Sequence, residues 1–513
     1  MLSQSENTKR IAKNTMMLYA RMLLSMVVSL YTSRVILQAL GVQDYGIYNV
    51  VGGLVAMFAI VSSSLSSAAS RFLTFEMGKG DLQGLKTVFT TSVYIHVALA
   101  VVVLALMEWV GLWFLNSRMT IPDARMEAAN WVFQASVFSF AINLTSVPYN
   151  ACIVAHERMS AFAYIGMLDI GLRLAAVVCV AHLSCFADRL VAYAFLLLGV
   201  CVVIRVISVV YCRRCFVECR LDRKIDVACC KKMGAFAGWN FIGCSAALLR
   251  DHGVNLLLNI FAGPILNAAR GIAMTVNSAV CSLAGNFMMA LNPQITKSYA
   301  SGERAYMMSL VERGSRFSFY ILLMFTLPVL METDFILTLW LRDYPAHTAN
   351  FVRLVLLLSM VDILSSTLIV LQNATGKIRN YQLAVGGAYM LNFPLSYLCL
   401  KAGLPPESVF VVAISVALCC LMLRLIFLRR GVGLSVRGYV RNVCVNVAVV
   451  SMIALPVPML CRMGAQDGWL RFVMVGVTSV ICSCVSIIIL GCSHSERRFI
   501  VQRAAMVLNR FRR

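Results

Sequence analysis

The chain is poor in charged residues, and acidic side chains are the scarcest of them. Only 13% of its 513 residues are charged and 60% are hydrophobic, with 45 Lys and Arg against 23 Asp and Glu. Soluble domains hold about 25% charged residues, so this composition excludes a soluble protein. No stretch is long and polar enough to form a separate soluble catalytic domain. The nucleotide-binding pattern G-x-x-x-x-G-K-[ST] is also absent, so no ATP site is predicted.

The cysteines show no disulfide pattern. Many of the 19 cysteines lie inside apolar runs, where Cys packs as a small hydrophobic side chain. One cluster stands apart, and it comprises Cys212, Cys215, Cys219, Cys229 and Cys230. Its spacing matches zinc-binding patterns poorly. Reduced thiols are therefore expected, and no metal or cofactor is predicted.

Long apolar runs recur from end to end of the chain. They predict an all-α polytopic membrane protein with about 14 transmembrane helices, since about 20 apolar residues span a bilayer. The expected spans are 14–39, 45–70, 88–115, 128–153, 159–184, 189–211, 233–260, 264–290, 316–341, 350–374, 379–401, 407–428, 438–460 and 470–491.

The net charge of +22 is distributed unevenly between the expected loops. With a cytoplasmic N-terminus, inside regions carry 31 Lys and Arg, among them Arg424, whereas outside loops carry 8 and the spans carry six. Cytoplasmic loops of membrane proteins are enriched in Lys and Arg. The pattern predicts that both termini are cytoplasmic, and it attributes the basic charge to membrane topology, so no nucleic-acid partner is predicted.

A weak internal repeat divides the chain into halves. A shift of 222 positions places Lys9-Arg10 on Lys231-Lys232 and Gly80-Asp81 on Gly302-Glu303. An even number of helices separates the copies, which predicts two six-helix lobes related by a pseudo-twofold axis along the membrane normal. The expected division is an N-terminal lobe at 1–212, a basic cytoplasmic loop at 213–232, a C-terminal lobe at 233–430, two additional helices at 437–492 and a basic cytoplasmic tail at 493–513.

Six arginines lie inside expected spans. An arginine at the bilayer centre costs about 2.5–3.5 kcal/mol even on lenient scales. These side chains must therefore line a wet cavity, pair with acids or meet an anionic ligand. Together they predict a cationic cavity for negatively charged cargo, and its candidate residues are Arg21, Arg34, Arg173, Arg205, Arg250 and Arg270.

Acidic residues in the spans leave alternatives open. Asp169 and Arg173 are four residues apart on one helix, so they are expected to form an ion pair. Asp362 has no opposite charge nearby in sequence, which is typical of a proton or sodium coupling site. Arg250 lines the cavity or forms a buried ion pair between helices. His252 carries a coupling proton or is simply hydrogen-bonded inside the bundle.

The stretch from Tyr31 to Asp81 carries the motif L-G-x-x-D-Y-G-x-Y, preceded by Arg34 and followed by Arg71-Phe72. The second half adds Gly263-Pro264 and N-A-A-R-G. The chain resembles the polysaccharide transporters of the multidrug/oligosaccharidyl-lipid/polysaccharide (MOP) exporter superfamily, especially the Wzx-type flippases of Gram-negative bacteria. The positions that carry this resemblance are Arg34, Gly41, Asp44, Tyr45, Gly46, Arg71, Asn267 and Arg270.

The resemblance implies two lobes around a central cavity and a multi-pass protein of the bacterial inner membrane. It implies flipping of an undecaprenyl-diphosphate-linked oligosaccharide, such as an O-antigen or capsule repeat unit, from the cytoplasmic to the periplasmic leaflet by alternating access. The implied partners are this lipid-linked oligosaccharide diphosphate, membrane lipids, a glycan polymerase and other assembly proteins.

Two other functions are weighed against the flippase. A multidrug antiporter of the same superfamily would carry cationic cargo, and it would need carboxylates rather than arginines along its path. A membrane-embedded glycan polymerase or ligase would need a large outer loop with catalytic groups, and no expected outer loop is long enough. The sequence therefore favours a transporter over an enzyme.

Overall fold

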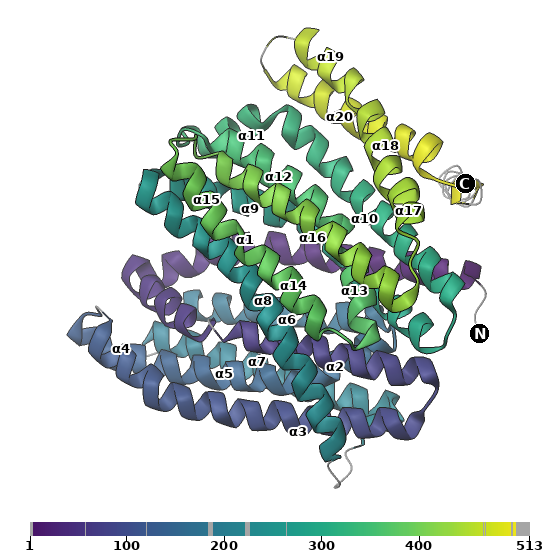
Figure 1. The fold of residues 1–513 in the computed structure, drawn as a ribbon. Coiled ribbons are helices and arrows are strands. Elements are labelled where there is room, and N and C mark those ends of the chain that lie inside the picture. Colours follow the sequence, from purple (N-terminus) through teal and green to yellow (C-terminus); the bar gives the residue numbers. More distant parts are fainter. Residues whose placement is uncertain are drawn as a thin grey trace, which may run out of the picture. The chain divides into compact units, whose positions relative to one another are not determined.

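The computed structural model describes residues 4–493 and 496–498, except 57, 120, 183–187, 221–225, 263, 465 and 467. Every regular element in that part of the chain is a helix (Figure 1). The chain forms two compact units. Unit 1 comprises Met1–Cys244 and Thr296–Gly302, and unit 2 comprises Ser245–Ile295 and Glu303–Arg513. The units divide inside a long helix, α8, after Cys244.

Unit 1 is a bundle organised around one central helix. That helix, α5, packs against α7, α3 and α2, while α1 packs against α6. Its buried side chains include Val132, Phe133 and Leu144, so the core lies along α5. The elements are α1 (Gln4–Ala56), α2 (Ala59–Lys79), α3 (Leu82–Leu106), η1 (Met107–Gly111), α4 (Leu112–Arg118), α5 (Asp123–Ala155), α6 (Met159–His182), α7 (Arg189–Cys215), η2 (Val217–Cys219) and the first half of α8 (Val227–Ala262).

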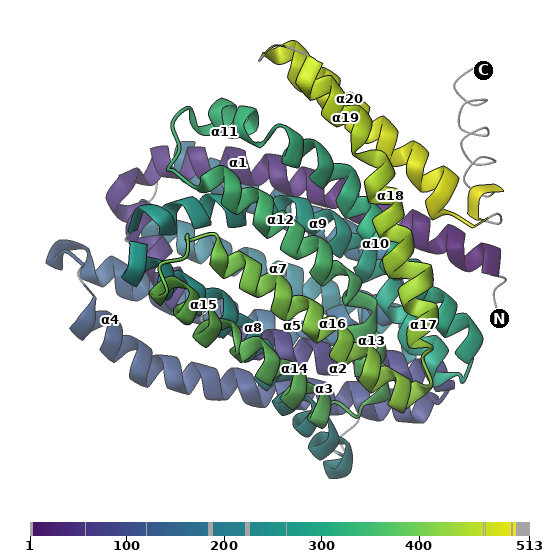
Figure 2. The same cartoon turned by 45° about the horizontal axis from the view of Figure 1, so that its top comes forward.

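Unit 2 begins within α8 and contains the remaining helices, except the end of α9 from Thr296 onward. α16 packs against α12, α14 and α15, and α20 packs against α10 and α19; Figure 2 shows α18 and α20 lying side by side. The elements are α9 (Pro264–Ala300), α10 (Arg304–Met331), α11 (Thr333–Leu341), α12 (Thr348–Leu364), α13 (Ser366–Thr375), α14 (Arg379–Met390), α15 (Asn392–Lys401), α16 (Ser408–Val432), α17 (Val436–Tyr439), η3 (Val440–Val445), α18 (Asn446–Ala454), α19 (Pro456–Gly464), α20 (Trp469–Ser486) and η4 (Ile487–Gly491).

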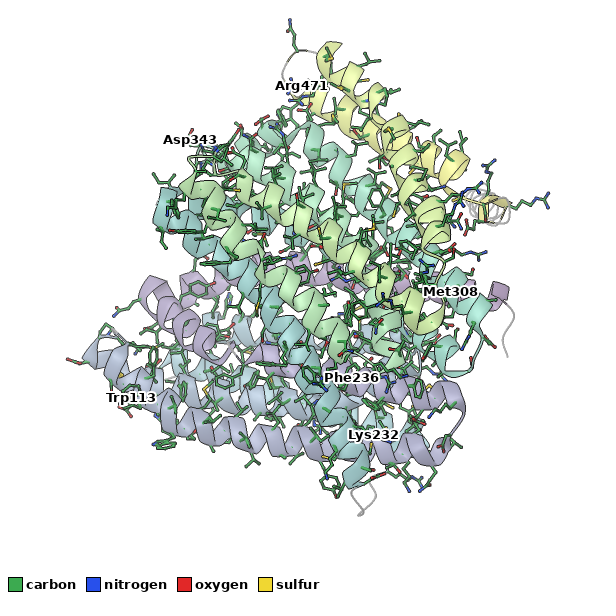
Figure 3. All side chains as sticks on the ribbon, viewed as in Figure 1. Trp113, Lys232, Phe236, Met308, Asp343 and Arg471 are labelled. Carbon is green, nitrogen blue, oxygen red and sulfur yellow. The ribbon has the colours of Figure 1, made fainter. Side chains whose placement is uncertain are left out.

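The helix plan expected from the sequence is confirmed. Within the described residues, eleven helical segments are long and apolar enough to cross a membrane. The other three expected spans, 14–39, 45–70 and 233–260, lie on α1, α2 and α8, which are also helical. Large apolar side chains such as Trp109, which is 80% exposed, remain on the surface of the units, as a bilayer environment allows. Trp113 in α4 is similarly exposed, and it is labelled in Figure 3.

Two of the expected spans have different limits in the structure. The second, at 45–70, is divided, since α1 ends at Ala56 and α2 begins at Ala59. The ninth was expected at 316–341, but α10 begins at Arg304 and ends at Met331. Charged residues at the start of α10 continue the helix beyond its apolar part, which hydropathy alone cannot detect. Pro264 begins α9 as expected, because proline suits the first turn of a helix.

The first glycine of the motif, Gly41, has a backbone conformation that favours glycine. It interrupts α1 with φ 80° and ψ 169°, a left-handed backbone conformation that glycine adopts without a steric penalty. The chain therefore bends between the first two expected spans. The paired glycines of the repeat also share a conformation, with φ 74° at Gly80 and 78° at Gly302.

The end of α9 is held in unit 1 by close contacts. A Cβ atom on Gly78 would lie 2.7 Å from the Ala300 Cβ and from the Lys297 carbonyl oxygen, so α2 and α9 approach each other closely. The Lys297 Nζ donates a 2.7 Å hydrogen bond to the carboxylate of Glu157, whose side chain is almost fully buried. This buried ion pair joins α9 to the turn between α5 and α6.

Candidate functional site

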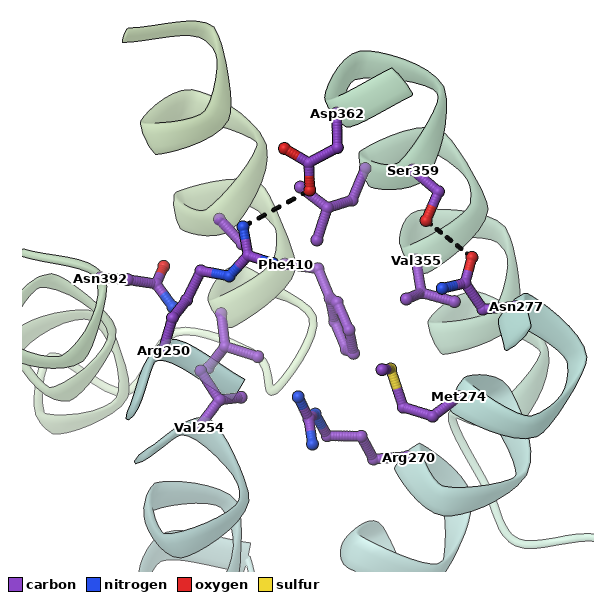
Figure 4. A pocket seen from close by; sticks show the side chains of 13 residues that line it. Arg250, Val254, Arg270, Met274, Asn277, Val355, Ser359, Asp362, Asn392 and Phe410 are labelled. Atoms are coloured by element: carbon purple, nitrogen blue, oxygen red, sulfur yellow. Dashed lines mark hydrogen bonds and ion pairs between the residues drawn. The ribbon is translucent and has the colours of Figure 1, made fainter. Parts of the chain in front are cut away.

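A polar cavity of about 230 Å³ lies inside unit 2. It is formed where α8, α9, α12, α15 and α16 face one another (Figure 4). Apolar side chains such as Val254 and Phe410 make up part of its wall. The polar and charged groups in the wall are Arg250, Arg270, Asn277, Ser359, Asp362 and Asn392.

The charged groups of this cavity come from three helices. Arg250 on α8 and Asp362 on α12 form an ion pair with Nη1 and Oδ2 3.4 Å apart. The Arg250 guanidinium also lies over the Tyr389 ring, 4.8 Å from its centre. Figure 4 shows this guanidinium turned toward Asp362. Arg270 on α9 is only 5% exposed, and it donates a hydrogen bond of 2.5 Å to Asn255.

Asp362 has a charged partner that is distant in the sequence. No opposite charge stands near Asp362 along the chain, which made it a candidate coupling site, whereas Arg250 was a candidate for an ion pair between helices. The fold brings Arg250 to it from 112 positions away. The ion pair neutralises a carboxylate that would otherwise be costly to hold inside a membrane protein.

A second polar cavity, of about 250 Å³, lies inside unit 1. Arg173 and Asp169 on α6 form the expected ion pair, with Nε and Oδ1 2.9 Å apart. The Arg21 guanidinium on α1 lies 4.6 Å above the centre of the Phe162 ring. A Cβ atom on Gly166 would lie 2.7 Å from the Arg21 Cδ, so this glycine provides space for the arginine. Polar wall residues are Ser25, Asn143 and Asn150.

Each cavity therefore has the same charge composition. In unit 2 two guanidinium groups, Arg250 and Arg270, accompany one carboxylate, Asp362. In unit 1 two guanidinium groups, Arg21 and Arg173, accompany Asp169. Arginine stays protonated in proteins, so among the described wall residues each cavity has one more positive than negative side chain. Such a wall can attract a phosphate or carboxylate group.

Two further arginines lie outside these walls. Arg205 on α7 lies over the Tyr149 ring, 4.2 Å from its centre. Arg424 on α16 is 2% exposed, although the sequence analysis placed it in a cytoplasmic region. Its guanidinium donates hydrogen bonds to the hydroxyls of Tyr381, Ser365 and Tyr389, at 3.2, 3.0 and 2.7 Å. Its position late in an apolar segment resembled that of a loop residue, and only the fold reveals these acceptors.

The motif around Asp44 has a structural role. Arg125 on α5 donates a 2.9 Å hydrogen bond from Nε to Asp44 Oδ1, and a 2.6 Å bond from Nη1 to Asp188 Oδ2. Asp188 in turn caps α7 by accepting from the backbone N–H of Leu190. Burial favours the protonated form of Asp188, but its hydrogen bonds outweigh this effect and hold the pKa of its carboxyl below the usual value.

Other motif positions are less informative about cargo. Tyr45 packs at the edge of the core around Ile36 and Val177, and a Cβ atom on Gly46 would meet no atom within 4 Å. The Arg71 guanidinium lies 4.4 Å from the Phe72 ring centre and 4.6 Å from that of Phe75. Side chains that lie outside the described residues are those of Arg34, His252 and Asn267.

Comparison with known proteins supports the fold. No protein-family model matches the chain, and no curated protein matches it. Solved structures do match, although their sequences are only distantly similar. A multidrug resistance MATE family transporter of the MOP superfamily, in an outward-facing conformation, has a TM-score of 0.70 and 12% identity over 83% of this chain and 95% of that one.

Two other solved structures show the same likeness. A MOP superfamily transporter from Pyrococcus furiosus, described by the reverse polarity of its binding pocket, has a TM-score of 0.66 and 13% identity over 82% of this chain and 95% of that one. The MATE transporter ClbM in complex with Rb⁺ has a TM-score of 0.67 and 12% identity over 84% and 96%. The chain therefore has the fold of the MATE transporters.

Proposed function

We propose that this chain, built on the fold of the MATE transporters, is a flippase for an anionic lipid-linked glycan. Its cargo is an undecaprenyl-diphosphate-linked oligosaccharide, which it moves from the cytoplasmic to the periplasmic leaflet of a bacterial inner membrane by alternating access. It acts as a transporter and not as an enzyme. The lipid tail stays in the bilayer while the polar cavities shield the sugars and the diphosphate.

The charge of the two cavities carries this proposal. Among the described residues, each wall holds two guanidinium groups and one carboxylate, so guanidinium groups outnumber carboxylates in both. Arginine also offers paired N–H donors that match phosphate oxygens. Arg250 and Arg21 lie against Tyr389 and Phe162, and aromatic faces of this kind can also stack against sugar rings.

The alternative is an ion-coupled multidrug antiporter. It is favoured by the structural likeness to MATE transporters. A cationic drug would, however, meet an excess of positive charge in either cavity. One structural neighbour is itself described by a pocket of reverse polarity that suggests a different function, so the fold is compatible with binding pockets of different polarity.

Coupling to an ion remains compatible with the proposed transport. Asp362 and Asp169 are the described carboxylates in the cavities, and each is held by an arginine. A proton or cation that binds one of these carboxylates would release its arginine toward the cargo phosphate. This step would link ion entry to binding of the anion.

The proposal is tested by deletion and complementation in cells. Without the protein, lipid-linked glycan should accumulate on the cytoplasmic leaflet, and the native chain should restore surface glycan. Charge reversal by Arg250→Glu or Arg21→Glu should abolish this rescue, since each cavity would become net negative. Normal surface glycan in the deletion strain, or full rescue by both reversed variants, would contradict the proposal.

A matched control distinguishes the effect of reversing a charge inside a cavity from the effect of reversing an arginine elsewhere in the chain. Arg214 is an exposed arginine in the last turn of α7, and Arg214→Glu should still restore surface glycan. Drug-resistance assays on the same strains test the alternative function. Resistance that depends on the native chain, with no change in surface glycan, would favour the antiporter.

A further inference from the structure

Thiol, imidazole and carboxylate groups meet at one end of unit 1. Cys152 and His156 lie one helical turn apart where α5 ends, so their side chains share a face. Glu218 and Cys219 lie on η2, a single 3₁₀ turn that follows α7. The donor atoms of Cys152, His156 and Glu218 all lie within 4.8 Å of one another.

A second buried thiol adjoins this group of three. The Cys219 Sγ lies 3.6 Å from the Cys152 Sγ, and the Cys152 Sγ lies 3.5 Å from the Glu218 Oε1. The His156 Nε2 also contacts this carboxylate oxygen directly. A further thiol, Cys212, is hydrogen-bonded to Cys219 and lies 3.6 Å from the Tyr149 carbonyl oxygen.

The cluster is enclosed on the protein side. Cys152 and Cys219 are 0% exposed, and the ring of Phe216 stacks on His156 with centres 4.0 Å apart. The His156 side chain keeps 27% of its surface exposed, which leaves a path for an ion to enter. Enclosed donors with one open side are what a metal site requires.

We propose that this cluster binds one zinc ion through Cys152, His156 and Glu218, with the neighbouring Cys219 thiol turning inward to take the fourth position. Zinc takes four ligands in a tetrahedron, and it accepts thiolate, imidazole and carboxylate donors. With a Zn–S bond of about 2.3 Å, two thiolates on one tetrahedral zinc stand about 3.8 Å apart. The distance of 3.6 Å between the two sulfurs is close to this value. Each thiol releases its proton to water as the ion binds.

A simpler interpretation is a hydrogen-bonded His–Glu pair beside reduced thiols. It accounts for His156 and Glu218, but it gives no reason for one buried thiol, Cys152, to face the same carboxylate while a second, Cys219, lies beside it. A disulfide between Cys152 and Cys219 would use both sulfurs and leave His156 and Glu218 without a role. Zinc uses all four donors at once, so the arrangement favours the metal.

The bound ion would fasten η2 to the end of α5. Residues 220–225 separate the end of η2 from Asp226, which directly precedes α8. Because η2 lies between α7 and α8, holding η2 in place also fixes the starting point of the connection that leads to α8. The site shares no residue with the wall of either cavity, and it does not depend on the nature of the cargo.

The test is metal analysis of the whole protein, purified in detergent without chelator. We expect about one zinc per chain by elemental mass spectrometry. Exchange of zinc for Co²⁺ should produce thiolate-to-cobalt charge-transfer absorption. Cys152→Ser and His156→Gln should each lower the zinc content at least several-fold, and Cys152→Ser should also weaken the charge-transfer band.

The matched control is Cys215→Ser, because Cys215 is an exposed cysteine near the same turn, and it should keep the metal. Size-exclusion profiles of every variant show whether the protein remains folded, and His156→Gln keeps both thiols in place. Absence of zinc from the folded native protein would overturn the proposal. A Cys152–Cys219 disulfide found by peptide mass spectrometry, or equal metal loss in Cys215→Ser, would overturn it as well.

Discussion

Arg205 and Arg424 occupy the same place in α7 and α16. Arg205 follows the first residue of α7 by 16 positions, and Arg424 follows the first residue of α16 by 16 positions. Each stands four residues after a cysteine and lies against a tyrosine ring, Tyr149 or Tyr389. Their separation of 219 is close to the 222 of the sequence repeat. The two helices therefore carry an arginine at the same position along their lengths.

The two arginines should differ in their importance for stability. Arg424→Met removes a charged donor from three buried hydroxyl acceptors, and each such bond contributes about 1.5–3 kcal/mol. Arg205→Met removes mainly a contact with one ring. We expect the larger drop in melting temperature for Arg424→Met, measured in the same detergent. Equal melting temperatures for the two variants would show that the hydroxyl network contributes little.

Variants of the Arg250–Asp362 pair distinguish a structural role of this ion pair from a role of Arg250 in binding cargo. Asp362→Asn should weaken stability modestly, since it leaves Arg250 without its ion-pair partner. The exchanged variant Arg250→Asp with Asp362→Arg restores the pair but moves the guanidinium to α12. We expect it to recover the melting temperature of the native chain without restoring glycan surface display. Restored display would mean that the position of the guanidinium is not important.

Arg125 should act as a structural anchor. Arg125→Gln removes the ionic hydrogen bonds to Asp44 and Asp188, and we expect a loss of about 1–3 kcal/mol in the free energy of unfolding. Asp44→Asn should cost less, because Asp188 remains paired with Arg125. Denaturant titrations of both variants measure this order. A larger effect of Asp44→Asn would indicate that the motif carboxylate has another partner.

Gly78 should tolerate no side chain. In Gly78→Ala the new methyl group would lie 2.7 Å from the Ala300 Cβ, and overpacking of this kind costs about 1–3 kcal/mol. Gly234→Ala in α8 is the control, because a Cβ atom there meets nothing within 4 Å. This control should be neutral or slightly stabilising. Thermal unfolding curves of the two variants should therefore move in different directions.

Local patterns account for what the sequence could predict. Apolar runs of sufficient length predict the helices, because every buried backbone group in a membrane must be satisfied within its own helix. The Asp169–Arg173 pair was predicted because residues four apart on a helix face each other. The break at Gly41 follows from the same local chemistry of glycine.

The tertiary structure alone decided which distant groups meet. Arg250 and Asp362 are separated by 112 positions, and Cys152 and Cys219 by 67, so no local periodicity links them. Arg424 was misplaced because charge near the end of an apolar run resembles a loop, until buried hydroxyls from another helix are seen around it. Composition and periodicity act along one helix, whereas cavities, ion pairs and metal sites depend on how helices pack side by side.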